Sequence, residues 1–358
     1  MLAAAPAGAL TKAASRLLLA AGGVRTLKAI ISRTCGGPET LDLADVPEPA
    51  PAAGQVLLAV HAVGVNYPDV LIIEDRYQIK PERPFSPGAE VSGVVEAVGA
   101  GVDGFRVGDR VLAMLGYGGM AEKVAVDAGR CTVLPDAMPF DEAAAFVMTY
   151  GTSYHALVDR AGLEPGETLL VLGAAGGVGL AAVELGAALG ARVVAAASSQ
   201  EKLDTAQASG AASGLLYPRG PIDRDGQKTL SAAFKDACGP NGADVIYDPV
   251  GGDYAEPALR SIAWEGRYLV MGFPSGIPKL PLNLLLLKGC DVLGVFWGAA
   301  VQKNPARHRK SVSELFALYA EGRIRPKISQ RFPLAQAGEA IAALASRQTT
   351  GKVVVTVR

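Results

Sequence analysis

The sequence predicts an α/β protein in which a doubly wound parallel sheet is inserted into a discontinuous β-rich domain. From Leu27 to about Val126, short β-branched runs are separated by Pro and Gly, as in antiparallel strands. From residue 152 onward, strand and helix patterns alternate, which indicates a parallel sheet. The chain ends on an isolated strand pattern, KVVVTV, which we expect to complete the first, β-rich unit.

The chain is long enough for this arrangement. Its 358 residues, 50% of them hydrophobic, can form two domains that each bury a core. The changes of pattern predict a leader at 1–27, the first part of the β-rich domain at 28–150, a nucleotide-binding domain at 151–292, and the second part of the β-rich domain at 293–358.

The composition argues against several partners and sites. The formal net charge is −1, so neither a nucleic acid nor an anionic membrane is expected as the main partner. The four cysteines lie far apart without a CxxC pair, which is typical of free thiols rather than disulfides or a zinc knuckle. The apolar stretch 282–297 is interrupted by Lys288 and Asp291, so no membrane span is expected.

The leader is basic and amphipathic. Lys12, Arg16 and Arg25 are basic, and the first acidic residue is Glu39. On a helix, Lys12 and Arg16 lie opposite a face of leucines and alanines. This pattern is typical of a mitochondrial transit peptide, so we expect a mitochondrial location. The alternative is an N-terminal extension with no targeting role.

Residues 171–199, VLGAAGGVGLAAVELGAALGARVVAAASS, predict a strand, a glycine turn, a helix and a second strand. Glycines let the backbone approach a pyrophosphate, and the helix start offers free N–H groups to it. One departure is Ala174, where the GxGxxG pattern has its first glycine. The alternative is an ordinary strand-to-helix turn. The expected cofactor contacts in the turn are Ala175, Gly176, Gly177, Val178 and Gly179.

The end of the second strand indicates which nucleotide binds. An acid there would bind the ribose 2′-OH of NAD and repel a 2′-phosphate, but this strand ends at Ala197. Nearby hydroxyls and a lysine suit a phosphate, so we expect NADPH. Lys202 could instead be an ordinary solvated helix residue, and Arg219 lies in a loop too irregular to place. The expected contacts are Ser198, Ser199, Lys202 and Tyr217.

Seven motifs occur in order along 28–358: GVNYPD, PGAEVSGVVEAVG, VGDRV, TYGTSYHAL, AAGGVG, YDPVGG and GKVVV. With them the chain resembles the zinc-independent, zeta-crystallin-like quinone oxidoreductases of the medium-chain dehydrogenase/reductase superfamily. The resemblance implies a Rossmann domain inserted in a GroES-like catalytic domain. It also implies a homodimer, which we expect to form through the apolar strand at 290–297, because an open sheet edge would otherwise pair without control.

The same resemblance implies that the protein binds no catalytic metal. Zinc-dependent members of the superfamily carry a ligand Cys where Asn66 stands and a ligand His where Ala89 stands. Glu90 is retained, but one carboxylate does not make a zinc site.

Further site residues are implied only by the resemblance. Asn66 and Tyr77 are the catalytic candidates: Asn66 beside the nicotinamide, and Tyr77 in the acceptor pocket as a hydrogen-bond donor. The alternative for Tyr77 is an ordinary loop aromatic residue. For the aromatic cofactor candidates the alternative is packing between the domains, and for Arg347 and Lys352 it is a solvated surface. The remaining cofactor candidates are Thr152, Gly272, Phe273, Phe296, Trp297, Arg347 and Lys352.

The expected function is metal-free hydride transfer from NADPH to quinones or other small α,β-unsaturated carbonyls. Mitochondrial enoyl-thioester reductases are relatives with the same fold, so that activity remains an alternative. A non-enzymatic NADPH-binding protein is another.

Overall fold

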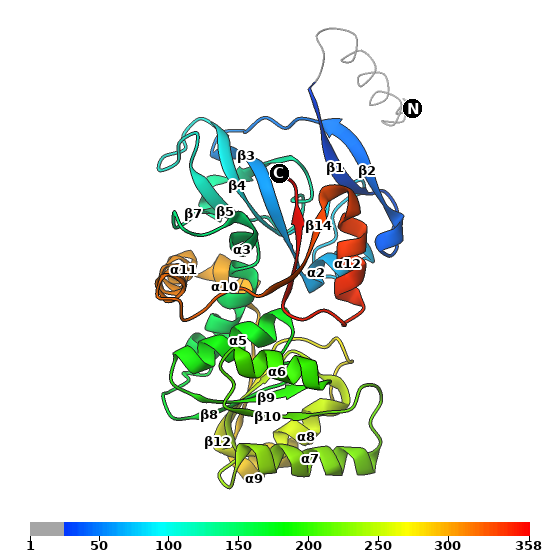
Figure 1. The fold of residues 1–358 in the computed structure, drawn as a ribbon, viewed down its shortest axis with the longest axis vertical. Helices are drawn as coiled ribbons and strands as arrows, with labels where there is room; N and C mark the ends of the chain where they lie inside the picture. The colour runs from blue at the N-terminus through cyan, green and yellow to red at the C-terminus, as the bar shows by residue number, and fades with distance from the viewer. Residues whose placement is uncertain (1–24) are drawn as a thin grey trace, which may run out of the picture.

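The structure is a computed structural model that describes residues 25–358. The expected transit peptide therefore lies outside the described residues except for its last three positions. Strand β1 already begins at Thr26, two residues before the predicted domain boundary at 28. The elements form two lobes, an upper lobe rich in antiparallel strands and a lower lobe built on a parallel sheet (Figure 1).

The upper lobe contains a seven-stranded sheet whose order is β14-β15-β3-β4-β5-β7, with β6 also paired to β3. A separate pair, β1 and β2, is antiparallel. The last strand of the chain, β15, pairs antiparallel with β3, so the expectation that it completes the first unit is confirmed. The bounds are β1 Thr26–Ser32, β2 Leu41–Pro47, β3 Gln55–Val65, β4 Glu90–Val98, β5 Arg110–Met114, β6 Lys123–Asp127, β7 Cys131–Val133, β14 Ile328–Pro333 and β15 Lys352–Thr356.

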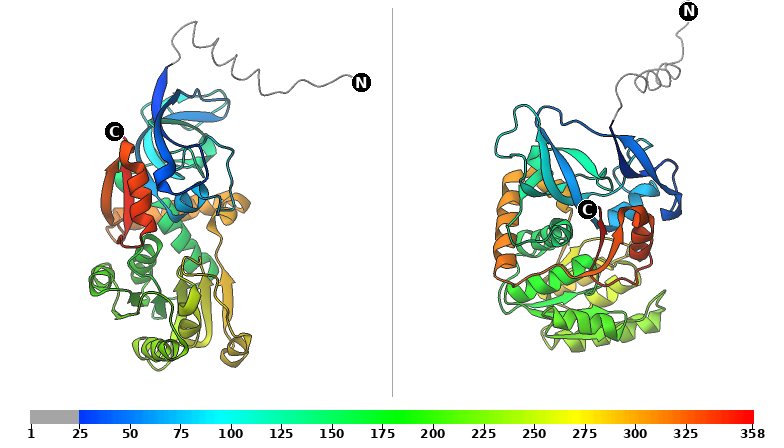
Figure 2. Two further views of the ribbon diagram at one scale, coloured as in Figure 1. Left: turned by 90° about the vertical axis from the view of Figure 1, so that its right-hand side faces the viewer. Right: turned by 45° about the horizontal axis from the view of Figure 1, so that its top comes forward.

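Short helices cover the upper lobe. Helix α12 packs against α2 and β15, so chain segments from both ends of the sequence share one core (Figures 1 and 2). The core is formed mainly by valines of β3, β4 and β15, which suit a pleated, buried surface. The helical bounds are η1 Pro38–Thr40, α2 Tyr67–Ile73, η2 Ala128–Arg130, η6 Leu334–Gln336 and α12 Ala337–Ala345.

The lower lobe is a six-stranded parallel sheet with the order β10-β9-β8-β11-β12-β13. This is the doubly wound order, in which ligands bind at the carboxyl ends of the strands where the order reverses, here between β8 and β11. The predicted fold class is confirmed. The bounds are β8 Thr168–Val171, β9 Arg192–Ala197, β10 Ser213–Leu216, β11 Ala243–Asp248, β12 Ile262–Val270 and β13 Asp291–Gly294.

Helices lie on both faces of the parallel sheet (Figure 1). Apolar residues run continuously through β8 and β9 because both faces of these strands are buried. The helical bounds are α5 Gly177–Ala188, α6 Gln200–Ala208, α7 Arg224–Cys238, η5 Gly252–Tyr254, α8 Ala255–Leu259 and α9 Leu282–Lys288.

Two helical segments join the lobes. The first runs from α3 to η4, and the second consists of α10 and α11, which lie beside it (Figures 1 and 2). The predicted domain boundary at 292/293 falls inside β13, just before the second segment. No helix among residues 25–358 combines the length and apolar character needed to cross a membrane. The bounds are α3 Phe140–Ala144, η3 Val147–Gly151, α4 Thr152–Tyr154, η4 His155–Arg160, α10 Trp297–Lys303 and α11 Pro305–Ala320.

Candidate active site

A cleft of about 710 Å³ lies between the lobes, at the carboxyl ends of β8, β9 and β11. Both lobes line it: the lower lobe through its strand-to-helix loops, and the upper lobe through the end of β3 and the segment before β15. The location agrees with the strand-order reversal described above. Ten of the predicted site residues line this cleft: Asn66, Ala175, Gly176, Gly177, Val178, Ser198, Lys202, Tyr217, Arg347 and Lys352.

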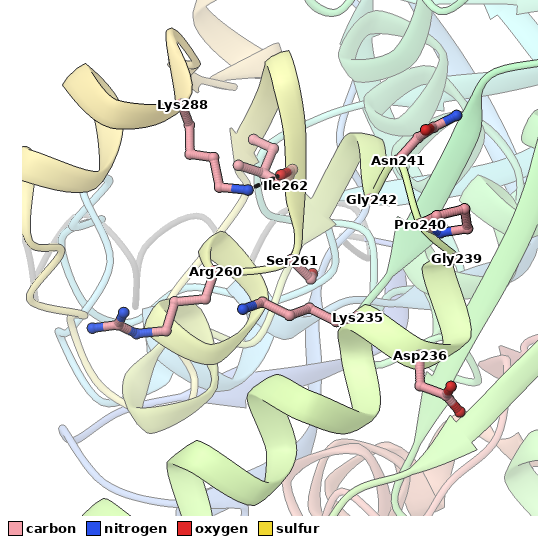
Figure 3. A pocket seen from close by; sticks show the side chains of 10 residues that line it. All are labelled: Lys235, Asp236, Gly239, Pro240, Asn241, Gly242, Arg260, Ser261, Ile262 and Lys288. Atoms are coloured by element: carbon pink, nitrogen blue, oxygen red, sulfur yellow. Dashed lines mark hydrogen bonds between the residues drawn. The ribbon is translucent and has the colours of Figure 1, made fainter.

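A second hollow of about 550 Å³ lies at the opposite edge of the parallel sheet, where β11 and β12 begin. Its charged side chains do not converge, since the Arg260 guanidinium and the Asp236 carboxylate point in different directions (Figure 3). Arg260 pairs with Glu256, and the Lys288 ammonium donates to the Ile262 carbonyl at 3.0 Å. The cleft between the lobes is therefore the stronger candidate.

The glycine turn begins α5 and connects the lobes. Gly176 is the residue before the helix, and its carbonyl accepts the first helical hydrogen bond from Leu180 N at 2.8 Å. The N–H groups at the start of α5 have no helical partner and can bind an anion. Gly351 of the upper lobe donates its N–H to the Ala175 carbonyl at 2.8 Å. This bond ties the segment before β15 to the turn.

Gly179 lies beneath the turn rather than in the cleft. A Cβ atom there would lie 2.2 Å from the Gly173 carbonyl oxygen and 3.0 Å from Ala174 Cα. Only glycine therefore allows α5 to pack this close to the end of β8. The structure gives Gly179 a packing role.

Positive charge gathers where β9 ends. Arg219 Nε donates to Ser198 Oγ at 3.1 Å, and Lys202 Nζ donates to the Arg347 carbonyl oxygen at 2.8 Å. Burial lowers the pKa of Lys202, and the nearby charge of Arg219 lowers it further. Lys202, Arg219 and Arg347 all line this end of the cleft. Three cations therefore surround a site that is suited to an anion. Ser199, in contrast, precedes α6 and does not line the cleft.

Two tyrosines pack beside this cation cluster. The ring centroids of Tyr217 and Tyr254 are 4.9 Å apart, and Tyr254 OH donates to the Pro218 carbonyl at 2.8 Å. Burial raises the pKa of Tyr217 to about 12, so it stays a neutral donor. Sequence reasoning missed Tyr254, although it closely follows the quoted YDPVGG motif.

Asp248 of that motif shapes the neighbouring loop. Its buried carboxylate accepts hydrogen bonds from Val250 N at 2.8 Å, Gly251 N at 2.9 Å and Tyr268 OH at 2.5 Å. Burial raises the pKa of Asp248. The carboxylate thereby holds the loop that brings Pro249 and Val250 to the cleft.

At the other end of the cleft, a buried polar network joins Asn66, Glu90 and Lys352. The Asn66 amide donates to the Gly64 carbonyl and to Glu90 Oε2, both at 3.0 Å. Lys352 Nζ lies 2.6 Å from Asn66 Oδ1 and 3.4 Å from Glu90 Oε2. Glu90 Oε1 accepts from Met148 N at 2.8 Å. All three side chains are at most 5% exposed.

Asp69 lies behind this network. Its carboxylate accepts from Asn66 N at 2.8 Å and from Gly88 N at 3.1 Å, which fixes the start of α2. Burial is the main cause that raises the pKa of Asp69 from 3.8 to about 6.

This raised pKa predicts a pH dependence of stability. The folded protein holds the proton more tightly than the unfolded chain, so the stabilisation is complete below pH 3.8 and is lost as the pH rises through about 6. Relative to Asp69→Asn, which does not titrate there, the wild type should lose about 2–3 kcal/mol of unfolding free energy between pH 4 and 7. Urea unfolding of both proteins at the two pH values measures it, and a constant difference would contradict it.

The remaining predicted residues do not line the cleft. Tyr77 is partly buried and packs against the upper core. Thr152 Oγ1 donates to the Met148 carbonyl at 2.5 Å. Trp297 packs against Gly151 and His308. Phe273, next to Gly272, and Phe296 are exposed on the surface.

Thr149 and Tyr67 also line the cleft, and the sequence analysis did not select Thr149. The Thr149 hydroxyl hydrogen-bonds the Ala145 and Phe146 carbonyls, at 3.0 and 3.2 Å. Its quoted neighbour Thr152 is three residues further on in TYGTSYHAL. The motif indicated this segment, but only the rotation of the helix about its axis decides which of its threonines faces the cleft.

Comparison with known proteins finds family matches in both lobes. A family model described as Alcohol dehydrogenase GroES-like domain matches residues 52–136, and one described as Zinc-binding dehydrogenase matches residues 177–317. The chain is 41% identical to Quinone oxidoreductase-like protein 2 homolog of Nematostella vectensis, over 84% of this chain and 81% of that protein. It is 40% identical to Quinone oxidoreductase-like protein 2 of Bos taurus, over 85% of each.

Among solved structures, the chain resembles the quinone oxidoreductase of Escherichia coli complexed with NADPH. The TM-score is 0.84 at 29% identity, over 92% of this chain and all of that chain. Despite the zinc in one model's description, the described residues do not fit that ion. Asn66 and Ala89 are poor zinc ligands, and the Lys352 ammonium already lies against Asn66 and Glu90. Within residues 25–358 no cluster of three or more His, Cys, Asp and Glu side chains is suited to a metal ion.

Proposed function

The chain belongs to the zeta-crystallin-like quinone oxidoreductase family of the medium-chain dehydrogenase/reductase superfamily, and on this premise we propose that it reduces quinones or other α,β-unsaturated carbonyls with NADPH and without a metal. The observation that carries the proposal is the cleft itself. It joins the cation cluster at the end of β9 to the network around Lys352 at the end of β3.

NADPH, when bound, supplies the hydride. The chain's own residues bind and orient the two reactants. The N–H groups at the start of α5 hold the pyrophosphate. Arg219, Lys202 and Ser198 hold the 2′-phosphate, which an acid at Ala197 would have repelled. The acceptor then lies at the end lined by Asn66, Tyr67 and Lys352, where the two lobes meet.

The test is NADPH oxidation by the full chain with an ortho-quinone, an alkenal and an enoyl-CoA. We expect turnover with the quinone or the alkenal. Turnover restricted to enoyl-CoA would favour an enoyl-thioester reductase. Tight NADPH binding without turnover on any acceptor would favour a non-enzymatic NADPH-binding protein.

We also propose a homodimer that pairs β13 with its copy. The outer edge of β13 has no partner strand among the described residues, and α9 beside it exposes Leu282, Leu286 and Leu287. Three exposed leucines on one short helix, with Leu286 82% exposed, form an apolar patch of the kind that marks an interaction surface. Trp264, which is also exposed, lies beside Gly289 at the end of α9.

The dimer predicts a specific variant effect. Leu286→Glu should convert the dimer to a monomer in light scattering at micromolar concentration, because a charge would be buried in the interface. Val107→Glu, which alters an exposed apolar residue of the other lobe, should leave the dimer intact. A monomeric wild type would refute the proposal.

The leader carries a third proposal, import into mitochondria. Replacing Lys12, Arg16 and Arg25 with Glu should leave a fluorescent fusion in the cytosol while the wild-type fusion is imported. A cytosolic wild-type fusion with an intact N-terminus would refute it.

A further inference from the structure

The side chain of Asn66 has no hydrogen left to offer a ligand. Its two amide hydrogens are directed to the Gly64 carbonyl and Glu90 Oε2, and its oxygen accepts from Lys352. The amide cannot be reversed without facing the Lys352 ammonium with its own N–H groups. Asn66 lines the cleft, but in this arrangement it holds another group in place.

That group is the ammonium of Lys352. An ammonium has three N–H donors, and the structure directs two of them at Asn66 Oδ1 and Glu90 Oε2. Lys352 lines the cleft whereas Glu90 does not, so the lysine is the member of this buried pair that borders the ligand space. Its stem passes close to Gly177, where an added Cβ would lie 3.2 Å from Lys352 Cδ.

We propose that Lys352 stabilises the negative charge that develops on the carbonyl oxygen of the acceptor. Lys352 then provides the positive charge beside Asn66, the position at which zinc-dependent relatives carry a metal ligand. The inference rests on the proposed function and names the residue that would polarise its acceptor.

The electron balance of the step is simple. A hydride, one proton with two electrons, leaves the nicotinamide ring of NADPH and forms a C–H bond at the electron-poor carbon of the acceptor. The displaced π electrons move to the carbonyl oxygen, which the ammonium stabilises through a hydrogen bond. Water then supplies the proton to this oxygen, and Lys352 keeps its own.

A purely structural role is the competing explanation, since Lys352 also neutralises the buried charge of Glu90. Lys352→Met alone would leave that carboxylate unpaired and could unfold the chain. The informative variant is therefore Lys352→Met combined with Glu90→Gln. It leaves no buried charge at this pair, and the Asn66 amide can turn over to pair with the new amide.

We expect the double variant to lower kcat for the ortho-quinone by about 10²–10³-fold, as for the loss of one oxyanion donor, with the KM for NADPH changed less than about threefold. Lys235→Met, at the remote hollow, should leave both constants unchanged. A double variant that retains kcat within threefold would show that Lys352 only balances Glu90, and would overturn the proposal.

A second measurement needs no turnover. Para-nitrophenol, titrated by its absorbance in the NADP⁺ complex, mimics an oxygen that gains negative charge. The pKa of the bound phenol should be about 1–3 units lower in the wild type than in the double variant. Equal values, or no phenol binding to the wild type, would overturn the proposal. If the wild type reduces no acceptor, the proposed function fails and this titration alone decides the role of Lys352.

Discussion

Replacing Lys202 and Arg219 together with alanine should raise the Kd for NADPH by about two to four orders of magnitude, and the Kd for NADH by less than about threefold. Each charge-assisted bond to a 2′-phosphate contributes about 1.5–3 kcal/mol, and about 1.4 kcal/mol corresponds to a factor of ten. Both residues line the end of the cleft at Ser198, and neither has a carboxylate partner there. NADH has no phosphate at this position to lose.

Fluorescence titration with each nucleotide measures the effect. Lys228→Ala, on the exposed side of α7, removes a cation elsewhere in the same lobe and should leave both affinities unchanged. Equal weakening of NADPH and NADH would contradict the assignment, because it would place the two cations near a group common to both nucleotides.

Gly179→Ala should lower the free energy of unfolding by about 2–4 kcal/mol, the cost of overpacking a site that cannot relax freely. The added methyl would lie 2.2 Å from the Gly173 carbonyl oxygen, so α5 must move away from the end of β8. The glycine turn would move with it, and NADPH binding should weaken as well.

Gly176→Ala is the matched control for stability. Its backbone is extended at φ −76°, and the nearest atom to a new Cβ would be the Gly173 oxygen at 3.4 Å. We expect a loss below about 1 kcal/mol, since alanine is only a poorer residue at the helix start. Urea unfolding compares the two variants, and similar losses would refute the close-packing argument for Gly179.

The sequence predicted those features that depend on residues close together in the chain. The glycine cluster between two apolar runs predicted the turn at α5, and the alternation of strands and helices predicted the parallel sheet. The lack of an acid at position 197 concerns a single residue at a strand end, so it too was evident from the sequence.

The sequence could not predict which side chains from distant parts of the chain come together in the cleft. Arg219 meets Ser198 because β9 and β10 are neighbours, but the path of the loop after β10 depends on packing, including that of Tyr217 against Tyr254. The aromatic residues Phe273 and Phe296 follow late strands as predicted, yet they lie exposed outside the cleft. A position after a strand does not decide where a loop side chain points.

The amino-acid sequence by itself determined the fold class, the nucleotide turn and the missing acid, because each follows from periodicity or from residues adjacent in the chain. Only the tertiary structure decided that Lys352 lies against Asn66 and Glu90, which are separated from it by 286 and 262 residues. The physical reason is that β15 returns to pair with β3, and β3 pairs with β4. Burial in that sheet then requires each polar group to find a partner, and the nearest partners are distant in sequence.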